Sequence, residues 1–333
     1  MAWQTLDEEG ATTTCLLVSV TDRSTEPEGP RPRSIVVTGA SDGIGREAVR
    51  AFANAGDRVV MVGRNEAKTA AAARTLMSET GSRAIEWEIA DLSRQDAIRE
   101  LAKRLRTRMP SIDVLINNAG ALFLDRECTA EGLERTFALN HLAYFSLSLL
   151  LVDSLAAAAT AGHPSRILCV SSRAHREARL VLDDLQMANG YSGWRAYANS
   201  KFANLLFARA LARRLSPASI VVHALHPGLV STRFAVGNGL RGRMLRRLMD
   251  LMSITPAQGA DTMVWLASAP VPAQTTGEYW VKRTAVAPRA DALDDALADA
   301  LWQRSADLAN LDADAMIARS GAGRLSAAQM EHR

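Results

Sequence analysis

Two hydrophobic patterns alternate along this chain of 333 residues from Ser34 onward. Short β-branched and apolar runs predict buried strands, and the longer stretches between them carry apolar residues three or four positions apart, as amphipathic helices do. The predicted strands are Ile35 to Thr38, Arg58 to Val62, Ala84 to Glu88, Val114 to Ile116, Arg166 to Ser171, Ile220 to Leu225 and Glu278 to Val281. The main predicted helices are Gly43 to Ala55, Glu66 to Glu79, Ser93 to Thr107, Glu131 to Leu155 and Trp194 to Leu215.

This order of elements predicts the fold class and the domain boundaries. Strands that alternate with helices form a parallel sheet, and right-handed crossovers place helices on both of its faces. We therefore expect a single α/β domain over residues 34–290, with a doubly wound sheet of seven parallel strands. Residues 1–33 end in a proline-rich stretch and are expected to form a flexible extension. Residues 291–333 are expected to hold a last helix, Ala292 to Leu308, and a flexible tail.

Composition and charge argue against several classes of protein. The 39 basic and 36 acidic residues give a net charge of +3, which is too balanced for dedicated nucleic-acid binding. Cys15, Cys128 and Cys169 lack a paired spacing, and the histidines lack metal-ligand spacing, so we expect neither a disulfide framework nor a metal site. No apolar run reaches the roughly 18 residues that an integral membrane anchor needs. We expect a cytoplasmic protein, and the scarcity of lysine, with four residues in the chain, is typical of a GC-rich bacterial genome.

Candidate chemistry begins where the first strand ends. The segment Thr38-Gly39-Ala40-Ser41-Asp42-Gly43-Ile44-Gly45 leads directly into a helix, whose N-terminus presents free backbone N–H groups and the positive end of its dipole. Such a turn suits a dinucleotide pyrophosphate, because glycines leave room for the phosphates. The spacing GxxxGxG differs from the common GxGxxG fingerprint, so the segment by itself is also compatible with a glycine-rich turn that binds nothing.

Further motifs follow in order, and together they carry a resemblance. They are Asp91-Leu92 after the third strand, Asn117-Asn118-Ala119-Gly120 after the fourth, Asn140 in the middle helix, Ser171-Ser172 at the end of the fifth strand, Tyr197-Ala198-Asn199-Ser200-Lys201 in the long helix, and His226-Pro227-Gly228 with Thr232 after the sixth strand. On these motifs, residues 34–310 resemble the short-chain dehydrogenase/reductase family. The resemblance implies a Rossmann fold and an oxidoreductase.

The residue types also support this chemistry directly. Tyr197 and Lys201 lie four positions apart on one predicted helix face, so the ammonium is expected to lower the tyrosine pKa from about 10 toward neutrality. Ser172, at the carboxyl end of a strand, can donate a hydrogen bond to the substrate oxygen. We prefer it to Ser171 because the resemblance implies it: in that family the serine is normally the residue that ends the strand. An isolated Tyr-x-x-x-Lys pair is usually an ordinary surface pair, but the accompanying motifs argue against that alternative.

The resemblance assigns roles to these residues. It implies that Tyr197 is the general acid/base, that Lys201 also holds the nicotinamide ribose, that Ser172 orients the substrate oxygen and that Asn140 maintains a water-mediated proton relay. The cofactor-binding residues that we expect are Thr38, Gly39, Ser41, Asp42, Gly43, Ile44, Gly45, Arg64, Asp91, Leu92, Asn118, Ala119, Gly120, Tyr197, Lys201, Pro227, Gly228, Val230 and Thr232.

The residue after the second strand indicates which cofactor is bound. An acidic side chain there would accept from the ribose 2′-hydroxyl of NAD(H), whereas an arginine would bind the 2′-phosphate of NADP(H). Arg64 stands at this position and no acid does, which favours NADP(H) over NAD(H). Asp42 departs from family members that have a basic residue in the glycine loop, and it places a negative charge near that phosphate.

Finer features resemble the retinol dehydrogenase and protochlorophyllide reductase-like branch of the family. They include residues 194–207, Asn140-His141-Leu142 and the 25 positions that separate Ser172 from Tyr197. Substrates in that branch are usually lipophilic alcohols, aldehydes or ketones. Residues 230–255 are expected to form the substrate lid. Their arginine-rich part could be a lid helix, an ordinary packed helix or, less favoured, a surface that contacts membranes.

We therefore predict an NADP(H)-dependent oxidoreductase that interconverts a carbonyl and an alcohol on a lipophilic small molecule, either retinoid-like, steroid-like or a secondary metabolite. One alternative is reduction of an enone C=C bond on the same scaffold. Another is a non-catalytic NADP(H)-binding sensor or scaffold, against which the intact Ser172, Tyr197 and Lys201 argue. The resemblance also makes a homodimer or homotetramer through the two long helices possible.

Overall fold

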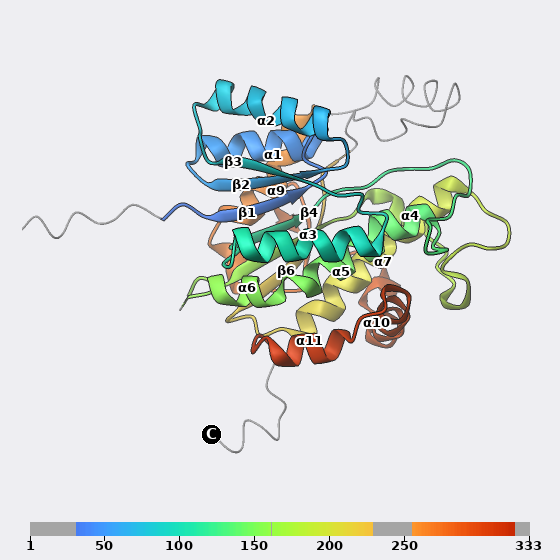
Figure 1. Cartoon of the computed structure of the whole chain (residues 1–333). Coiled ribbons are helices and arrows are strands. Elements are labelled where there is room, and N and C mark those ends of the chain that lie inside the picture. The colour runs from blue at the N-terminus through green and yellow to red at the C-terminus, as the bar shows by residue number, and fades with distance from the viewer. Residues whose placement is uncertain (1–30, 161, 229–254, 324–333) are drawn as a thin grey trace, which may run out of the picture. The chain divides into compact units, whose positions relative to one another are not determined.

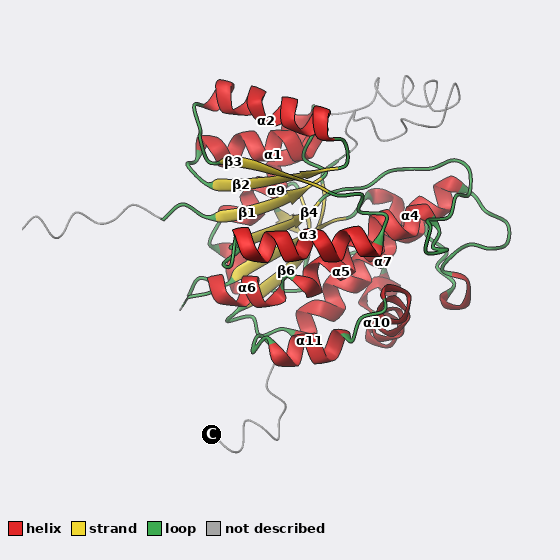
Figure 2. Ribbon diagram, in the orientation of Figure 1, coloured by secondary structure: helices red, strands yellow, loops and turns green. Residues whose placement is uncertain are grey.

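The computed structural model describes residues 31–160, 162–228 and 255–323, and within these ranges it contains one sheet (Figures 1 and 2). The strand order is β3-β2-β1-β4-β5-β6-β7-β8. The strands are β1 Ser34–Thr38, β2 Arg58–Gly63, β3 Ile85–Ile89, β4 Val114–Asn117, β5 Ser165–Val170, β6 Ile220–His226, β7 Tyr279–Val281 and β8 Thr284–Ala285. All neighbours from β3 to β7 pair in parallel, so the predicted doubly wound α/β fold is confirmed.

The sheet has one strand more than the seven predicted. The two residues of β8 pair antiparallel with β7 through a tight turn. Lys282 and Arg283 form this turn with φ values of 49° and 61°, the left-handed conformation that two-residue hairpins require. Glycine and asparagine usually occupy such positions, and because neither is present here, this segment carries no hairpin signal.

Helices cover both faces of the sheet, as Figure 1 shows. One face carries α1 Gly43–Asn54, α2 Glu66–Thr80 and α9 Pro256–Ser268; the other carries α3 Gln95–Arg108, α5 Ala143–Leu150 and α7 Gly193–Arg214. Successive strand residues serve opposite faces: Val60 and Val62 belong to the core under α3, α5 and α7, whereas Val59 and Met61 belong to the core under α1, α2 and α9. This alternation follows from the two-residue period of a strand.

The predicted middle helix, Glu131 to Leu155, is wrong as one continuous element. It is divided into α4 Arg135–Phe137, the π-helix η1 Ala138–Leu142, α5, and α6 Val152–Ala158. The helix begins late because the buried Glu134 carboxylate accepts from the backbone N–H groups of Thr136 and Phe137, at 2.8 and 2.7 Å. Glu134 therefore acts as an N-cap, and the residues before it lie outside the helix.

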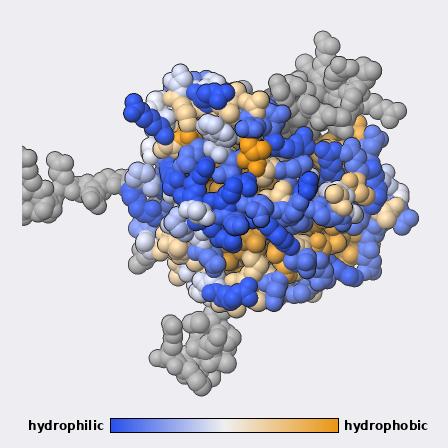
Figure 3. All heavy atoms as spheres, viewed as in Figure 1, coloured by the Kyte–Doolittle hydropathy of each residue, from blue (hydrophilic) through white to orange (hydrophobic). Residues whose placement is uncertain are grey.

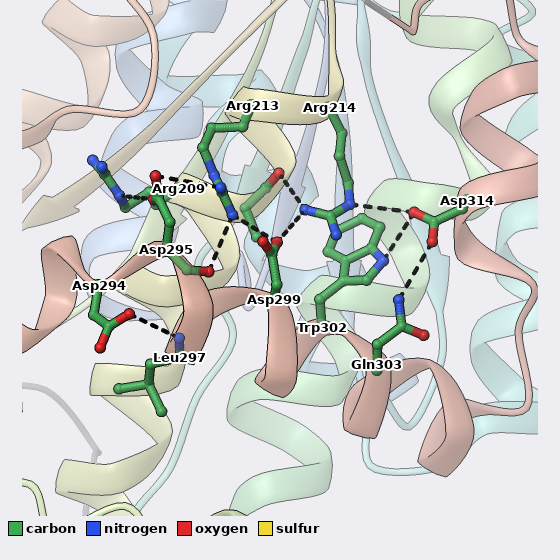
Figure 4. A network of polar contacts seen from close by, with 11 residues as sticks. Arg209, Arg213, Arg214, Asp294, Asp295, Leu297, Asp299, Trp302, Gln303 and Asp314 are labelled. Atoms are coloured by element: carbon green, nitrogen blue, oxygen red, sulfur yellow. Dashed lines mark hydrogen bonds and ion pairs between the residues drawn. The ribbon is translucent and has the colours of Figure 1, made fainter. Parts of the chain in front are cut away.

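The C-terminal helices α10 Asp295–Ala309 and α11 Ala313–Arg319 pack on α7 and α5, respectively. The predicted helix Ala292 to Leu308 corresponds to α10, and α11 is an additional element. Figure 4 shows the polar network that joins α10 and α11 to α7. The Asp299 carboxylate accepts from Arg213 at 2.6 Å and from Arg214 at 2.8 Å, and the Arg214 guanidinium lies 4.3 Å from the centre of the Trp302 ring. These contacts tie the end of the described fold to the helix that carries Tyr197 and Lys201.

We expect Asp299→Ala to lower the free energy of unfolding by about 1 kcal/mol more than Asp307→Ala does. Asp307 is the matched control because it is exposed on the same helix and its side chain pairs with no other described residue. Both changes gain the same helix propensity, so the difference isolates the Arg213 and Arg214 contacts. Thermal unfolding is expected to show a midpoint about 2 °C lower for Asp299→Ala than for the control. Equal midpoints would show that the network contributes nothing to stability.

Arg33 anchors the start of the described chain. It was predicted to end the flexible extension, but its guanidinium pairs with Asp57 at 2.5 Å and donates to the carbonyl of Ala267 at 2.8 Å. The ordered fold therefore begins at least one residue before β1. Residues 1–30, to which the rest of that prediction applies, lie outside the described ranges.

The length and hydropathy of the described helices bear on whether one of them could span a membrane. None of them is long and apolar enough to cross a bilayer alone, and the one adjacent pair that reaches the required length together is bent by 56°. That pair includes α5, whose side chains are almost all buried against the sheet. The face of the molecule seen in Figure 3 is mostly hydrophilic, with hydrophobic residues scattered over it.

Candidate active site

The structure brings the four predicted catalytic residues together at the carboxyl ends of β4 and β5. Ser172 follows β5, Tyr197 and Lys201 lie in the first half of α7, and Asn140 lies in η1. The Ser172 hydroxyl is hydrogen-bonded to the Tyr197 side chain. A Cβ atom on Gly120 would lie 3.2 Å from both the Asn140 Oδ1 and the Lys201 Nζ. Glycine at position 120 thus allows the Asn140 amide and the Lys201 ammonium to approach the same point.

The two serines at the end of β5 have different surroundings. The Ser171 hydroxyl is buried and donates to the backbone carbonyl of Lys201 at 2.7 Å, which fastens α7 to the sheet. The Ser172 hydroxyl instead meets the Tyr197 phenol and accepts from the N–H of Ala174 at 3.2 Å. Of the two serines, Ser172 is therefore the one whose hydroxyl lies beside the Tyr197 phenol.

His175 holds the backbone of Ser172. Its N–H and its Nδ1 both lie close to the Ser172 carbonyl oxygen, at 3.0 and 2.6 Å. Because a carbonyl only accepts, Nδ1 carries the proton and donates it. Burial lowers the pKa of His175, which favours this neutral form. The sequence analysis found no metal-ligand spacing for the histidines, and these contacts show that His175 supports the backbone next to Ser172.

Lys201 is buried and held from several sides. Its Nζ donates to the carbonyl of Val170 at 3.0 Å, and it lies 5.4 Å from the ring centre of Tyr144 and 5.7 Å from that of Tyr197. Burial lowers the pKa of Lys201 to about 7. The ammonium can therefore lose and regain a proton near neutral pH. Tyr144 was not predicted; its hydroxyl donates to the carbonyl of Ala119 at 2.9 Å, which connects it to the loop after β4.

The expected downward shift of the Tyr197 pKa is not found. Burial raises the pKa of Tyr197 to about 12, because the phenolate loses hydration in the protein interior, and the hydrogen bond from Ser172 opposes this only in part. Lys201 does not offset the effect, since its Nζ lies beside the tyrosine ring and its own charge is destabilised by burial. At neutral pH Tyr197 is accordingly a protonated phenol, which is the form that donates a proton.

Asn140 is held rigidly by the loop after β4. Its Oδ1 accepts from the N–H of Ala121 and its Nδ2 donates to the carbonyl of the same residue, both at 2.9 Å. Its backbone carbonyl accepts from Asn204 at 2.8 Å. Asn204 was missed by the sequence analysis, although its place three residues after Lys201 puts both on one face of α7. The π-helix η1 and the hydrogen bond from Asn204 together fix the backbone of Asn140.

The glycine loop fits the phosphates of a dinucleotide. Gly39 has a φ of 65°, and a Cβ on Gly45 would lie 2.6 Å from the Gly39 carbonyl oxygen, so neither position accepts a larger residue without rearrangement. Asp42 caps α1 by accepting from the N–H of Gly43 at 2.9 Å. The next two N–H groups, of Ile44 and Gly45, donate to no other described residue. As in any helix, these N–H groups point out of the N-terminus, toward the loop that contains Ser41, which is the arrangement that an anion site requires.

Other predicted cofactor residues form the frame around this loop. The Thr38 hydroxyl accepts from the N–H groups of Asn118 and Ala119, at 2.8 and 3.0 Å, and the Asn118 amide donates to the Thr38 carbonyl at 2.8 Å. These bonds join the loops after β1 and β4. Asp91 accepts from the backbone and the hydroxyl of Ser93, at 3.0 and 2.7 Å, and Leu92 is buried. Asp91-Leu92 is thus a fixed turn at the end of β3.

The structure adds a second cation at the predicted 2′-phosphate site. Arg64 is exposed just after β2 and makes no hydrogen bond or ion pair with other residues in the described ranges. Lys68, in the first turn of α2, pairs with Asp42, with 2.8 Å between Nζ and Oδ2. The negative charge of Asp42 is therefore balanced. Lys68 was missed by the sequence analysis because its partner Asp42 lies 26 positions earlier in the chain.

The remaining predicted residues follow β6. Gly228 has a φ of 95°, and its N–H donates to the His226 Nδ1 at 3.3 Å, so Pro227 and Gly228 form a turn at the end of the strand. Val230, Thr232 and residues 230–254 of the lid expected over 230–255 lie outside the described residues, and its last residue, Thr255, is the N-cap of α9. Among the described residues, no group of three histidine, cysteine or acidic side chains could hold a metal ion.

Comparison with known proteins gives consistent matches. The family model described as short chain dehydrogenase matches residues 33–239. The candidate daunorubicin C-13 ketoreductase DnrU of Streptomyces sp. (strain C5) is 39% identical over 86% of this chain and 96% of its own length. Human retinol dehydrogenase 13 is 34% identical over 84% of this chain and 86% of its own.

Two solved structures are also similar to this chain. An uncharacterised protein from Mycobacterium paratuberculosis superposes with a TM-score of 0.67 and 31% identity, covering 84% of this chain and 94% of its own. The NADP complex of RhlG from Pseudomonas aeruginosa superposes with a TM-score of 0.59 and 27% identity, covering 74% of this chain and 93% of its own.

Proposed function

Since this chain belongs to the short-chain dehydrogenase family, we propose that it is an NADP(H)-dependent oxidoreductase that interconverts a carbonyl and an alcohol on a lipophilic small molecule. The observation that carries the proposal is the contact between the Ser172 hydroxyl and the Tyr197 phenol, with Lys201 beside the tyrosine ring. The names of two relatives, a retinol dehydrogenase and a daunorubicin ketoreductase, support a lipophilic substrate.

In the proposed reduction, a carbonyl, NADPH and one proton yield an alcohol and NADP⁺. The cofactor, when bound, supplies the hydride that the carbonyl carbon receives. Tyr197, protonated at neutral pH, donates its phenolic proton to the carbonyl oxygen. Ser172 donates a hydrogen bond to the same oxygen and stabilises the charge that develops there. The reverse reaction returns the proton to Tyr197.

Lys201 and Asn140 complete the proposed proton path. Because the pKa of Lys201 is about 7, its ammonium can give up a proton at neutral pH and replace the one that Tyr197 loses. Asn140 is fixed by hydrogen bonds with Ala121 and Asn204. We assign it to the water-mediated proton relay that the family resemblance implies. His175 keeps Ser172 in place through the Ser172 carbonyl.

Charge near the end of β2 supports NADP(H) as the preferred cofactor. Arg64 has no partner among the described residues and is available to a 2′-phosphate, and Lys68 adds a second positive charge while it neutralises Asp42. RhlG, which this fold resembles, is named as an NADP complex. A cytoplasmic location and assembly into a dimer or tetramer remain predictions.

The test of the proposed function is oxidation of NADPH and NADH against lipophilic aldehydes, ketones and enones, followed by absorbance at the nicotinamide band and by product analysis. We expect turnover with NADPH, an alcohol as product, and slower turnover with NADH. Saturated ketones as the main products from enones would instead support C=C reduction. Cofactor binding without turnover in either direction would favour the sensor or scaffold alternative.

A further inference from the structure

Trp194 is a large aromatic side chain that stays exposed close to the proposed catalytic tyrosine. It lies at the start of α7, and 43% of its surface is accessible. The other large hydrophobic residues exposed in the described ranges, Val181, Val286 and Leu293, are aliphatic. The centre of the Trp194 ring system lies 6.0 Å from that of Tyr197, with the ring planes tilted by 32°. Single exposed apolar residues are common on protein surfaces, so the informative feature of Trp194 is its place beside Tyr197.

The indole is also held in a fixed orientation. Its Nε1–H donates to the Glu177 carboxylate at 2.7 Å. Glu177 ends η2, the short helix that starts directly after Ser172. The side chain of Trp194 thus bridges the two segments that carry Ser172 and Tyr197, and a ligand that contacts it would not have to freeze its rotation.

The backbone under Trp194 is equally constrained. A Cβ on Gly193 would lie 2.2 Å from the carbonyl oxygen of Phe123 and 2.8 Å from the Cα of Leu124. The first turn of α7 therefore packs directly on the loop after β4. This contact fixes the start of α7, and with it Trp194, against the loop after β4, while the helix that carries both residues fixes Trp194 relative to Tyr197.

We propose that Trp194 is a stacking platform that selects planar aromatic carbonyl compounds at this site. The inference rests on the proposed function, because the platform matters only if Tyr197 acts on a carbonyl. A fixed indole with an accessible surface interacts best with a flat conjugated ring system, through offset stacking. Its single polar atom already has a partner in Glu177, so it offers no hydrogen bond to a substrate. Flexible aliphatic chains gain less from such a surface.

The test compares an aryl ketone, 2-acetylnaphthalene, with an aliphatic ketone of similar lipophilicity, 2-nonanone. Trp194→Leu is expected to raise the KM of the aryl ketone about tenfold and that of the aliphatic ketone less than twofold, with little change in either kcat. Trp194→Phe is expected to restore most of the aryl affinity. Val286→Ala, which changes another exposed apolar residue, serves as the control and is expected to alter neither KM.

Two outcomes would overturn the platform. One is an equal rise in the KM of both ketones. The other is a fall in kcat, which would mean that Trp194 positions or shields Tyr197 instead. Calorimetric binding of 2-acetylnaphthalene to Tyr197→Phe, with and without Trp194→Leu, gives a readout that needs no turnover. Absence of turnover with these ketones and with the whole panel above, in both directions, rejects the proposed function, whereas equal binding to both calorimetric variants rejects the platform by itself.

Discussion

Tyr197→Phe is expected to lower kcat for carbonyl reduction by about 10³-fold and to leave cofactor affinity within about fivefold of the parent. The phenol is the protonated group that contacts Ser172, and burial raises its pKa to about 12, so it is ready to donate a proton at neutral pH. Phenylalanine retains the ring that packs beside Lys201 and Trp194 but has no proton to give. The measurement is steady-state NADPH oxidation, with cofactor binding followed by fluorescence titration.

Tyr279→Phe is the control for the loss of a hydroxyl group. Tyr279 is buried on β7, and its hydroxyl makes no hydrogen bond with the residues that the structure describes. We expect this variant to retain the kcat of the parent. A Tyr197→Phe protein that keeps more than a tenth of the parent kcat would show that the proton comes from another group.

Arg64→Ala is expected to raise the KM for NADPH about 30-fold, because a charge-assisted hydrogen bond to the 2′-phosphate is worth about 2 kcal/mol. The KM for NADH, which has no 2′-phosphate, is expected to stay within about twofold of the parent. The two cofactors then differ in their response, and this difference separates recognition of the phosphate from a general loss of binding. The measurement is the KM of each cofactor at a saturating carbonyl concentration.

Arg74→Ala is the matched control for this prediction. Arg74 is an exposed arginine further along α2, and it pairs with no other residue in the described ranges. Its removal takes away the same charge at a greater distance, so only a long-range electrostatic effect would change the NADPH affinity. If Arg64→Ala and Arg74→Ala behave alike, Arg64 makes no direct contact with the 2′-phosphate. Asp42→Asn offers a further comparison, because it releases Lys68 and is expected to lower the NADPH KM.

The amino-acid sequence alone determined the layers of this fold and the places of the proposed catalytic residues. Val59 to Val62 alternate between the two faces of the sheet, and this pattern depends only on strand geometry. Tyr197 and Lys201 share a helix face for an equally local reason, the helical repeat. The glycine loop could likewise be recognised because it joins a strand directly to a helix. Local periodicity is visible in a single sequence.

Tertiary structure decided the features that depend on partners far apart in the chain. Lys68 meets Asp42 across 26 positions, and Asn204 reaches the carbonyl of Asn140 across 64. The pKa of Tyr197 rises instead of falling because burial outweighs the nearby lysine, and the degree of burial depends on how the whole chain packs. The late start of the middle helix was hidden for the same reason, since Glu134 caps it only once that carboxylate is enclosed. The local sequence pattern therefore indicates where the site lies, whereas long-range packing and desolvation set the pKa values and ion pairs within it.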